Sequence, residues 1–424
     1  MGNRQSTIGN RQPKARVAVV SPFLDKRHGT ERCVTEQIER LAEAYEIHVY
    51  SDRVEDMDSS RIVWHRVPAL PGPHLFAYCW WVVANQLCRW WDAQVRGFAP
   101  SMVYSPGINC FDADVISVHV VFGAYRGCAG KALDFHAHPA RSWPRLLHRR
   151  MYYRLLIGLE HLVYGGKRAT LTAISTKAAR NLRCYGRDES QIPVILYGID
   201  SVRFRPETRQ GLRESARRAL GLKEGDFCLL LVGNDWRNKG LRCLIESLSR
   251  LAVSSIRLLV VGHDTVDPYR EAITQFHLEH QIIFLPERPD IEFYYGAADL
   301  YAGPSLEDAF ALPPLEAMAC GVPALVSRQA GVSEVISDGV DGFVLDDPQD
   351  SSRVAEIVLL LYQNEGLRRR VGETAAKTAR QYTWDHNAEQ LGALFEEVLE
   401  KRKSGDRNQK NRESKLESRS SSKI

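Results

Sequence analysis

One pattern, which occurs twice along the chain, constrains the fold more than any other feature. A short aliphatic, β-branched run is followed by a glycine-containing loop, an amphipathic helix and a second apolar run. The first copy begins at 16–22 and the second at 227–232. This order is how a doubly wound α/β domain begins, because neighbouring parallel strands need a crossover helix. The 424 residues suffice for two such domains. We therefore predict an α/β fold of two Rossmann-like, doubly wound domains that face a cleft.

Further apolar runs predict the remaining strands. In the first half they lie at 47–51, 102–104, 115–119, 171–174 and 192–196, and in the second half at 257–261, 282–285, 300–302 and 324–327. We expect five segments: a disordered leader 1–15, an N-terminal domain 16–198, a C-terminal domain 199–380, a helix 381–400 packing back toward the N-terminal domain, and a disordered basic tail 401–424. The tail prediction rests on composition, since its only aliphatic residues are Leu416 and Ile424.

The formal net charge of +4 is unevenly distributed along the chain. Residues 1–16 carry four basic and no acidic side chains, and residues 401–424 carry nine basic and three acidic ones. The residues between them therefore have a net charge of −6. A mildly acidic body does not fit a large nucleic-acid footprint, so we expect no nucleic-acid partner.

Cysteine spacing and hydropathy indicate the compartment. None of the nine cysteines forms a C-x-x-C pair, which disfavours a zinc ribbon or a disulfide framework. The first sixteen residues hold no apolar stretch typical of a secretory signal, and no apolar run reaches the ~20 residues of a spanning helix. We expect a cytoplasmic protein with reduced thiols and no metal site.

The most informative segment is 304–323, PSLEDAFALPPLEAMACGVP, directly after an apolar strand. Pro313 and Pro314 suit the start of a helix, where a missing N–H is tolerated. A helix that begins right after a strand directs N–H groups at a ligand and typically binds phosphate. Glu316 is expected in its first turn, within reach of diol hydroxyls. Spacing alone equally supports a capped helix with an acidic first turn.

This segment, continued to 327, resembles the signature of the family-4 retaining glycosyltransferases, which have the GT-B fold. Their pattern is a Glu, seven residues and a second Glu, with Gly-Phe-Gly after the first. Here Asp308 replaces the first Glu, Glu316 is the second, and Ala309 and Ala311 replace the glycines. An alanine where φ must be positive would be strained. The resemblance covers about 16–395 and implies transfer of a sugar from a nucleotide diphosphate sugar with retention.

A second motif, LLLVGNDWRNKGL at 229–241, resembles the family's glycine-arginine-lysine loop. The resemblance implies that Lys239 and Arg237 contact the diphosphate and that Gly233 opens the loop. An ammonium and a guanidinium suit a diphosphate. Without the resemblance, they could be two exposed loop cations.

Two features of the first half also match. The loop 22–34 resembles a donor-facing loop that usually has two glycines, of which only Gly29 is present. His119 ends the strand in DVISVHVVFG, where relatives place a histidine on the donor sugar. A single histidine at a strand end can equally be structural.

Together these motifs imply one donor site. Its predicted catalytic residues are His119, Asp308, Arg237 and Lys239, and its predicted donor-binding residues are Gly29, Gly233, Arg237, Lys239, Asp308, Phe310, Ala311, Leu312 and Glu316. We expect no metal and no cofactor, with the nucleotide sugar as co-substrate. The acceptor would be a glycan or a lipid-linked molecule of envelope or exopolysaccharide biosynthesis.

Other functions fit the same sequence. The altered residues Asp308, Ala309 and Ala311 would suit a non-catalytic GT-B binding or scaffold subunit. A GT-B epimerase or phosphorylase is a third alternative.

The first half also carries an aromatic group and a basic group. The tryptophans are Trp64, Trp80, Trp81, Trp90 and Trp91, and the arginines are Arg141, Arg145, Arg149, Arg150 and Arg154. Tryptophans beside cations on amphipathic helices suit an anionic membrane surface, here the inner face of a membrane. The alternative is a tryptophan-rich core and a solvated basic face.

Overall fold

The computed structural model describes residues 14–124, 142–251 and 253–421, with side chains as far as 404. By their contacts these residues divide into two compact units. The first unit lies within Met1–Ser117, Tyr125–Leu171 and Ala388–Ile424, and the second consists of Val118–Ala124 and Thr172–Asn387.

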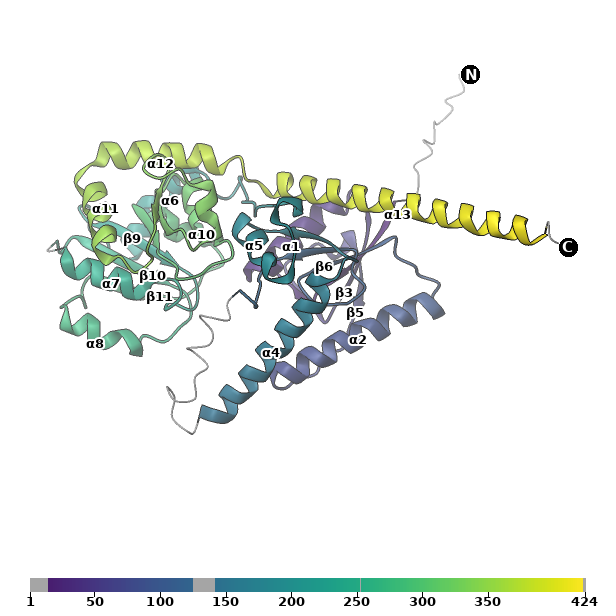
Figure 1. The fold of residues 1–424 in the computed structure, drawn as a ribbon. Helices are drawn as coiled ribbons and strands as arrows, with labels where there is room; N and C mark the ends of the chain where they lie inside the picture. Colours follow the sequence, from purple (N-terminus) through teal and green to yellow (C-terminus); the bar gives the residue numbers. More distant parts are fainter. Residues whose placement is uncertain (1–13, 125–141, 252, 422–424) are drawn as a thin grey trace, which may run out of the picture. The chain divides into compact units, whose positions relative to one another are not determined.

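The first sheet has six strands, and every strand pair whose register is defined is parallel. From edge to edge they are β5 (Ile62–Arg66), β3 (Glu46–Ser51), β1 (Arg16–Val20), β6 (Met102–Pro106), β7 (Val115–Val118) and β8 (Thr170–Ala173). Figure 1 labels β3, β5 and β6 of this sheet. In chain order this is the doubly wound sequence 3-2-1-4-5-6. Short strands β2 (Phe23–Leu24) and β4 (Arg53–Val54) pair separately.

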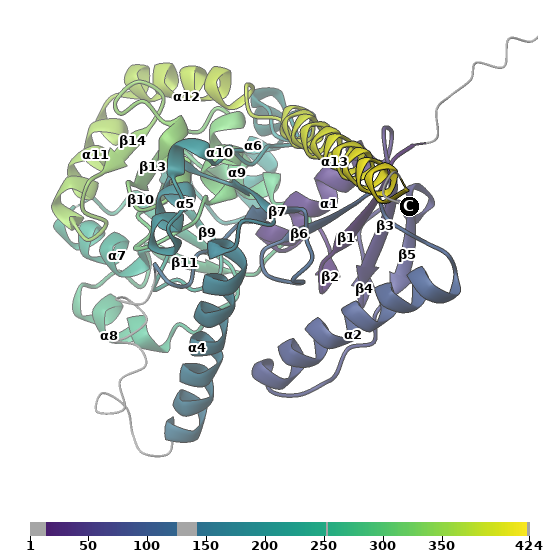
Figure 2. The same ribbon diagram turned by 45° about the vertical axis from the view of Figure 1, so that its right-hand side comes forward.

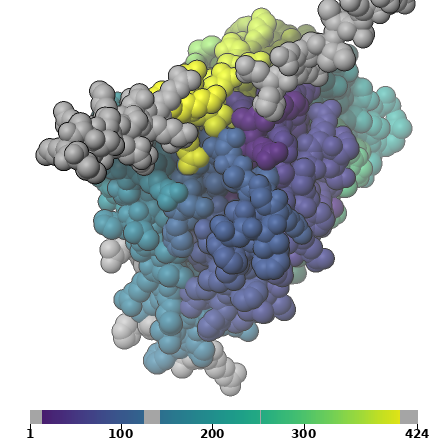
Figure 3. Space-filling model, turned by 90° about the vertical axis from the view of Figure 1, so that its right-hand side faces the viewer, coloured from purple at the N-terminus to yellow at the C-terminus, as the bar shows by residue number. Residues whose placement is uncertain are grey.

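Three long helices accompany the first sheet, namely α1 (Gly29–Leu41), α2 (His74–Val95) and α4 (Trp143–Gly165) (Figure 2). Figure 3 shows the face of the molecule on which α2, drawn in blue, lies at the surface. The tips of β7 and β8 cluster with the second unit.

The second sheet repeats the same order of six strands, again parallel. From edge to edge they are β11 (Ile282–Leu285), β10 (Ile256–Val261), β9 (Phe227–Val232), β12 (Leu300–Gly303), β13 (Ala324–Ser327) and β14 (Phe343–Leu345). Every residue of β9 is buried, which explains its uninterrupted apolar sequence: a central parallel strand is covered on both faces. The two-domain α/β fold predicted from the repeated pattern is confirmed.

Eight α-helices of the described residues lie wholly in the second unit. They are α5 (Thr176–Asn181), α6 (Pro206–Ala219), α7 (Leu241–Arg250), α8 (Asp267–Gln275), α9 (Glu292–Ala297), α10 (Leu312–Ala319), α11 (Ser351–Gln363) and α12 (Glu365–Ala379). None of the helices in the described residues is both long enough and apolar enough to cross a membrane.

The middle of the chain differs from the prediction in two places. The expected strand at 192–196 is reduced to one isolated bridge between Ala173 and Val194, because the preceding one-turn helix and Pro193 leave little extended backbone. Helix α6 lies within the polar stretch beyond 200, where no element was predicted. That helix has Pro206 in its first turn and packs against α9.

The C-terminal prediction also differs from the structure. Helix α13 runs from Trp384 to Ser421, where composition predicted a disordered tail beyond 400. Lysine, arginine and glutamate are good helix formers, and extending an existing helix needs no new nucleus. From Ala388 onward, α13 clusters with the first unit, where Phe395 packs against Tyr45 and Tyr104.

Candidate active site

The second sheet changes its winding direction between β9 and β12. In such sheets, ligands bind beyond the carboxyl ends of the strands at this switch point. The loop after β9 is 233–240 and the loop after β12 is 304–311, so the two most informative motifs of the sequence flank one crevice of the topology.

Two hydrogen bonds join these loops, one between backbone groups and one from the side-chain amide of Asn238. Leu306 donates its N–H to the carbonyl of Asn238 at 2.7 Å, and the Asn238 amide donates to the carbonyl of Glu307, also at 2.7 Å. A Cβ at Gly240 would lie 2.2 Å from the carbonyl oxygen of Pro304. Gly240 is therefore required for the close approach of the loops.

Lys239 and Asp308 meet where the loops join. The ammonium Nζ lies 2.5 Å from Oδ2 of Asp308, and only 19% and 15% of the two side chains are exposed. Gly233 has φ +135°, and a Cβ there would lie 3.0 Å from Cε of Lys239. The glycine thus leaves room for the lysine to cross the start of the loop.

The other end of Asp308 orders the turn into α10. Its Oδ1 accepts the N–H of Phe310 at 3.2 Å, and the Phe310 ring is buried. Ala311 then has φ +71° and ψ +100° directly before Leu312 begins the helix. The strain expected at an alanine in a glycine position is present at Ala311. Ala309 has no positive φ.

Glu316 lies deeper than expected. Because α10 begins at Leu312, Glu316 belongs to its second turn, and the prediction of the first turn is wrong. The residue is only 3% exposed, and its Oε2 accepts a hydrogen bond of 2.8 Å from the hydroxyl of Tyr295 on α9. Burial and the nearby carboxylate raise the pKa of Tyr295, so this hydroxyl remains a donor.

The start of α10 is a poorer anion site than its position suggests. Pro313 and Pro314 lack N–H groups, which removes two of the usual free donors. The Phe310 N–H is already used by Asp308. An anion at this position would therefore depend more on side-chain cations than on backbone N–H groups.

His119 belongs to the second unit and contacts the same region through an aromatic chain. Its Nδ1 lies 2.6 Å from the hydroxyl of Tyr197, whose ring centroid is 5.0 Å from that of Phe310. The imidazole is buried, which lowers the pKa of His119 to about 3. His119 is therefore neutral at physiological pH and can exchange hydrogen bonds but not charge.

The partners that fix the 304–311 loop were not predicted from the sequence. Lys177 on α5 forms an ion pair with Glu307 and donates to the carbonyl of Gln329 at 2.5 Å. Glu334 accepts the N–H groups of Thr176 and Lys177 at 2.8 and 2.9 Å. No local pattern marks Lys177, because its partners lie about 130–150 residues away in the chain.

Two predicted residues are not joined to this cluster. Arg237 is exposed on the 233–240 loop. Gly29 is in the first unit, where it begins α1, and a Cβ there would meet nothing within 4 Å. The structure thus shows no backbone requirement for glycine at 29.

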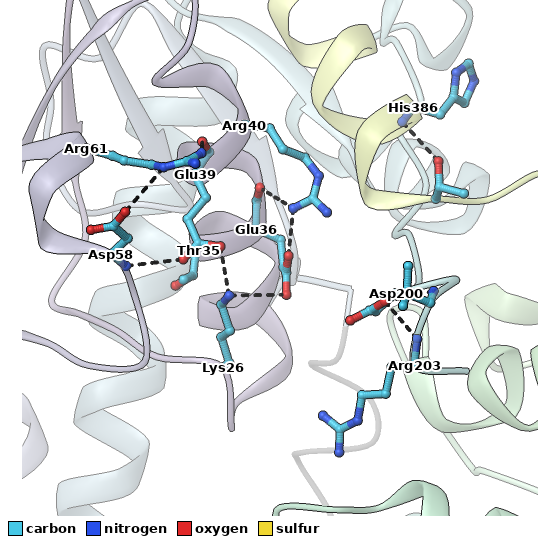
Figure 4. Close-up of polar contacts among 12 residues, drawn as sticks. Lys26, Thr35, Glu36, Glu39, Arg40, Asp58, Arg61, Asp200, Arg203 and His386 are labelled. Atoms are coloured by element: carbon cyan, nitrogen blue, oxygen red, sulfur yellow. Dashed lines mark hydrogen bonds and ion pairs between the residues drawn. The ribbon is translucent and has the colours of Figure 1, made fainter. Parts of the chain in front are cut away.

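The loop before Gly29 is ordered by side chains instead of glycines. Buried Asp25 accepts the N–H groups of Arg27 and His28, each at 2.9 Å. Lys26 lies 2.7 Å from Glu39 and 3.8 Å from Glu36, both on α1. Figure 4 shows Lys26 directed toward these two carboxylates. This loop has polar contacts of its own, so it needs no second glycine to keep its shape.

The described residues contain no group of three or more His, Cys, Asp or Glu side chains that could hold a metal ion. The charged groups that follow β9 and β12 include the Lys239–Asp308 pair and, on α10, the buried carboxylate of Glu316.

Comparison with known sequences gives a match over part of the chain. Residues 213–378, which contain the second sheet and this crevice, match the family of glycosyl transferases group 1. The chain is similar to D-inositol 3-phosphate glycosyltransferase of Nocardia farcinica, at 31% identity over 54% of this chain and 52% of the relative. The enzyme of that name from Corynebacterium glutamicum is 29% identical over 51% and 54%. The chain spans about half the length of these curated relatives.

Solved structures show the same fold over nearly the whole chain. WaaG, a glycosyltransferase involved in lipopolysaccharide biosynthesis, has a TM-score of 0.73 at 21% identity and covers 89% of this chain and 99% of its own. Anabaena HepE, solved in complex with UDP-glucose, has a TM-score of 0.64 at 17% identity and covers 90% and 99%. The fold is that of the GT-B glycosyltransferases.

Proposed function

We propose that this chain is a metal-independent, retaining glycosyltransferase of family 4. It would transfer a hexose from a nucleotide diphosphate sugar to a glycan or lipid-linked acceptor in envelope or polysaccharide biosynthesis. The observation that carries the proposal is the Lys239–Asp308 pair at the switch point of the second sheet, next to a helix that buries Glu316. The HepE complexes with UDP and UDP-glucose support a donor of this class.

The crevice suggests how the donor would be held. Lys239 would exchange Asp308 for the diphosphate, and exposed Arg237 would swing onto the same phosphates. Both cations would stabilise charge on the leaving nucleotide as the glycosidic bond breaks, an electrostatic form of catalysis. Asp308, released from the lysine but still held by the Phe310 N–H, would orient the donor sugar. Neutral His119 would offer the sugar a hydrogen bond.

A second function has an observation in its favour. Asp308 is one methylene shorter than the family's glutamate and is paired with Lys239, and Ala311 keeps a strained backbone. A GT-B subunit that binds a ligand without catalysis would tolerate these features.

Turnover separates the two functions. The purified chain is incubated with UDP-glucose, GDP-mannose and other nucleotide sugars, and release of the nucleoside diphosphate is measured with and without EDTA. We expect slow hydrolysis of one donor that EDTA does not reduce, and proton NMR should show the sugar released first as the anomer of the donor. Tight donor binding with no release over hours would favour the binding subunit.

A further inference from the structure

Helix α2 buries polar side chains and exposes apolar ones, which is the reverse of an ordinary surface helix. Its buried positions include the polar residues Asn85, Arg89 and Asp92. Its exposed positions are largely aromatic and aliphatic. A helix at a protein–water boundary normally buries its apolar stripe and exposes its polar side.

Buried partners fix this rotation of the helix. Asp92 accepts the hydroxyl of Tyr50 at 2.9 Å and lies 2.6 Å from Nδ1 of His65. Arg89 makes two hydrogen bonds to Asp112, at 2.6 and 2.7 Å. If α2 turned its apolar side inward, Arg89 and Asp92 would move outward with their side of the helix. The buried Tyr50 hydroxyl and the His65 ring would then lose their partner, which is costly. The apolar side of α2 therefore stays at the surface of the first unit.

The exposed stripe is continuous and large. Val83, Leu87 and Trp90 follow one another at helical spacing and are 52%, 56% and 56% exposed. Of the eighteen large hydrophobic residues exposed in the described chain, eleven lie on α2 or α4. Such concentrations of exposed apolar surface mark interaction sites.

Helix α4 adds positive charge beside this stripe. The helices contact each other, with the rings of Tyr78 and Tyr152 6.2 Å apart. On α4, Met151 and Arg154 are both exposed and lie three residues apart, so they share one side. The only acidic residues of the two helices, Asp92 and Glu160, are buried.

We propose that the exposed residues of α2 and α4, here called the α2–α4 face, dock on an anionic lipid bilayer. The exposed residues are Phe76, Trp80, Val83, Leu87, Trp90, Trp91 and Val95 on α2, and Trp143, Arg145, Leu147, Arg149, Met151, Arg154 and Leu162 on α4. Of the arginines predicted for this face, Arg141 lies outside the described residues. Trp81 is buried and does not belong to it.

The charge distribution favours lipid over a second copy of the chain. A two-fold dimer brings the same patch against itself, so the arginines of α4 would meet one another without acids to offset them. An anionic bilayer attracts the arginines and accepts the tryptophan and leucine side chains at its interface. The inference rests on the first unit alone and goes beyond the proposed activity, to which it adds access to a lipid-linked acceptor.

The test is co-sedimentation of the full-length chain with vesicles of phosphatidylglycerol and phosphatidylcholine, compared with phosphatidylcholine alone. One variant carries Val83→Gln, Leu87→Gln and Trp90→Gln. Its matched control changes three exposed hydrophobic residues of the second unit: Val202→Gln, Val340→Gln and Leu360→Gln. Glutamine suits helix positions, and circular dichroism verifies the folding of each variant.

A second pair of variants tests charge. One variant reverses the charge of three α4 arginines through Arg145→Glu, Arg149→Glu and Arg154→Glu. Its control makes the same change in net charge at exposed helix positions of the second unit, through Arg242→Glu, Arg270→Glu and Arg353→Glu. We expect wild type and both controls to bind anionic vesicles in a salt-sensitive manner. Each α2–α4 variant should lose at least about tenfold in partition coefficient.

Three results would overturn the proposal. The first is a wild type that stays in the supernatant. The second is equal binding by all variants, which would assign the attraction to the basic ends of the chain. The third is a wild-type dimer in sedimentation velocity that the glutamine variant converts to a monomer, with no vesicle binding. Nucleoside diphosphate binding, measured on the same samples, reports separately on the donor site.

Discussion

The connection between the third and fourth strands differs between the two sheets, although their strand order is the same. In the second sheet, β11 is joined to β12 through α9, a helix of six residues whose last four are buried. In the first sheet, β5 is joined to β6 through α2, a helix of 22 residues with an exposed apolar stripe. The same topological position therefore carries an internal support in one unit and a surface element in the other.

The difference shows how one topology can serve two tasks. Buried α9 places the Tyr295 hydroxyl against Glu316, so it supports the candidate donor site from inside the unit. Exposed α2 is anchored by Arg89 and Asp92 and presents its other side outward. Function in such folds belongs to the groups added to the sheet, not to the sheet itself.

The largest effect is expected at Glu316, which accepts a hydrogen bond from Tyr295 on α9. Glu316→Gln keeps the size of the side chain but removes its charge. If the carboxylate binds two donor hydroxyls, kcat/KM for the donor should fall about 100-fold or more, because each charge-assisted hydrogen bond contributes about 1.5–3 kcal/mol. The matched control is Tyr295→Phe, which removes the hydrogen bond and keeps the carboxylate. It should lower the free energy of unfolding by about 1–3 kcal/mol and turnover much less. Wild-type turnover in Glu316→Gln would refute the assignment.

A somewhat smaller effect is expected at Lys239. Lys239→Met keeps most of the stem and removes the charge. Affinity for the nucleoside diphosphate should fall about 10- to 100-fold, equivalent to about 1.5–3 kcal/mol, while affinity for the nucleoside stays the same. Titration calorimetry with both ligands measures the difference. Arg237→Met, in the same loop but exposed, serves as control and should lose less. Equal losses for the two ligands would place Lys239 outside the phosphate site.

The fold and the contact between the two loops of the second sheet could be predicted from the sequence, for a clear physical reason. Buried parallel strands such as β9 need continuous apolar runs, so each strand can be recognised from its own short segment of sequence. Once β9 and β12 are known, the switch-point rule brings the loops of Lys239 and Asp308 together.

What could not be predicted depends on partners that are distant in the chain. The depth of Glu316 follows from the exact start of α10, set by the positive φ of Ala311, and from Tyr295 on another helix. The rotation of α2 depends on Asp112, on Tyr50 and on His65. The composition rule failed for α13 because it ignores helix propensity.

The buried imidazole of His119 predicts that the stability of the protein depends on pH. His119 follows β7 of the first sheet but clusters with the second unit. Its pKa is lowered to about 3 by burial, against about 6.5 in an unfolded chain. Between these values the unfolded state binds the extra proton, so stability is full above about pH 6.5 and falls as the pH drops. The slope is about 1.4 kcal/mol per pH unit.

Denaturant unfolding of wild type and His119→Asn between pH 4 and 8 tests this sign. The asparagine variant should be less stable at pH 8 and lose less stability on acidification. The Tyr197→Phe control removes the 2.6 Å contact but keeps the imidazole, so it should retain the acid dependence. Parallel pH profiles for wild type and His119→Asn would show that His119 titrates normally.

The smallest expected effect concerns the alanines that replace two family glycines. Ala311 has φ +71°, a conformation that costs a residue with a Cβ roughly 1–2 kcal/mol, whereas Ala309 has no positive φ. Ala311→Gly should therefore raise the free energy of unfolding by about 1 kcal/mol, after the greater backbone entropy of glycine in the unfolded state is subtracted. Ala309→Gly pays only that entropy and should lower it by about 0.5–1 kcal/mol. Chemical denaturation measures both. If the two variants shift stability in the same direction, the turn before α10 is not strained, and the positive φ of Ala311 does not set the start of the helix that carries Glu316.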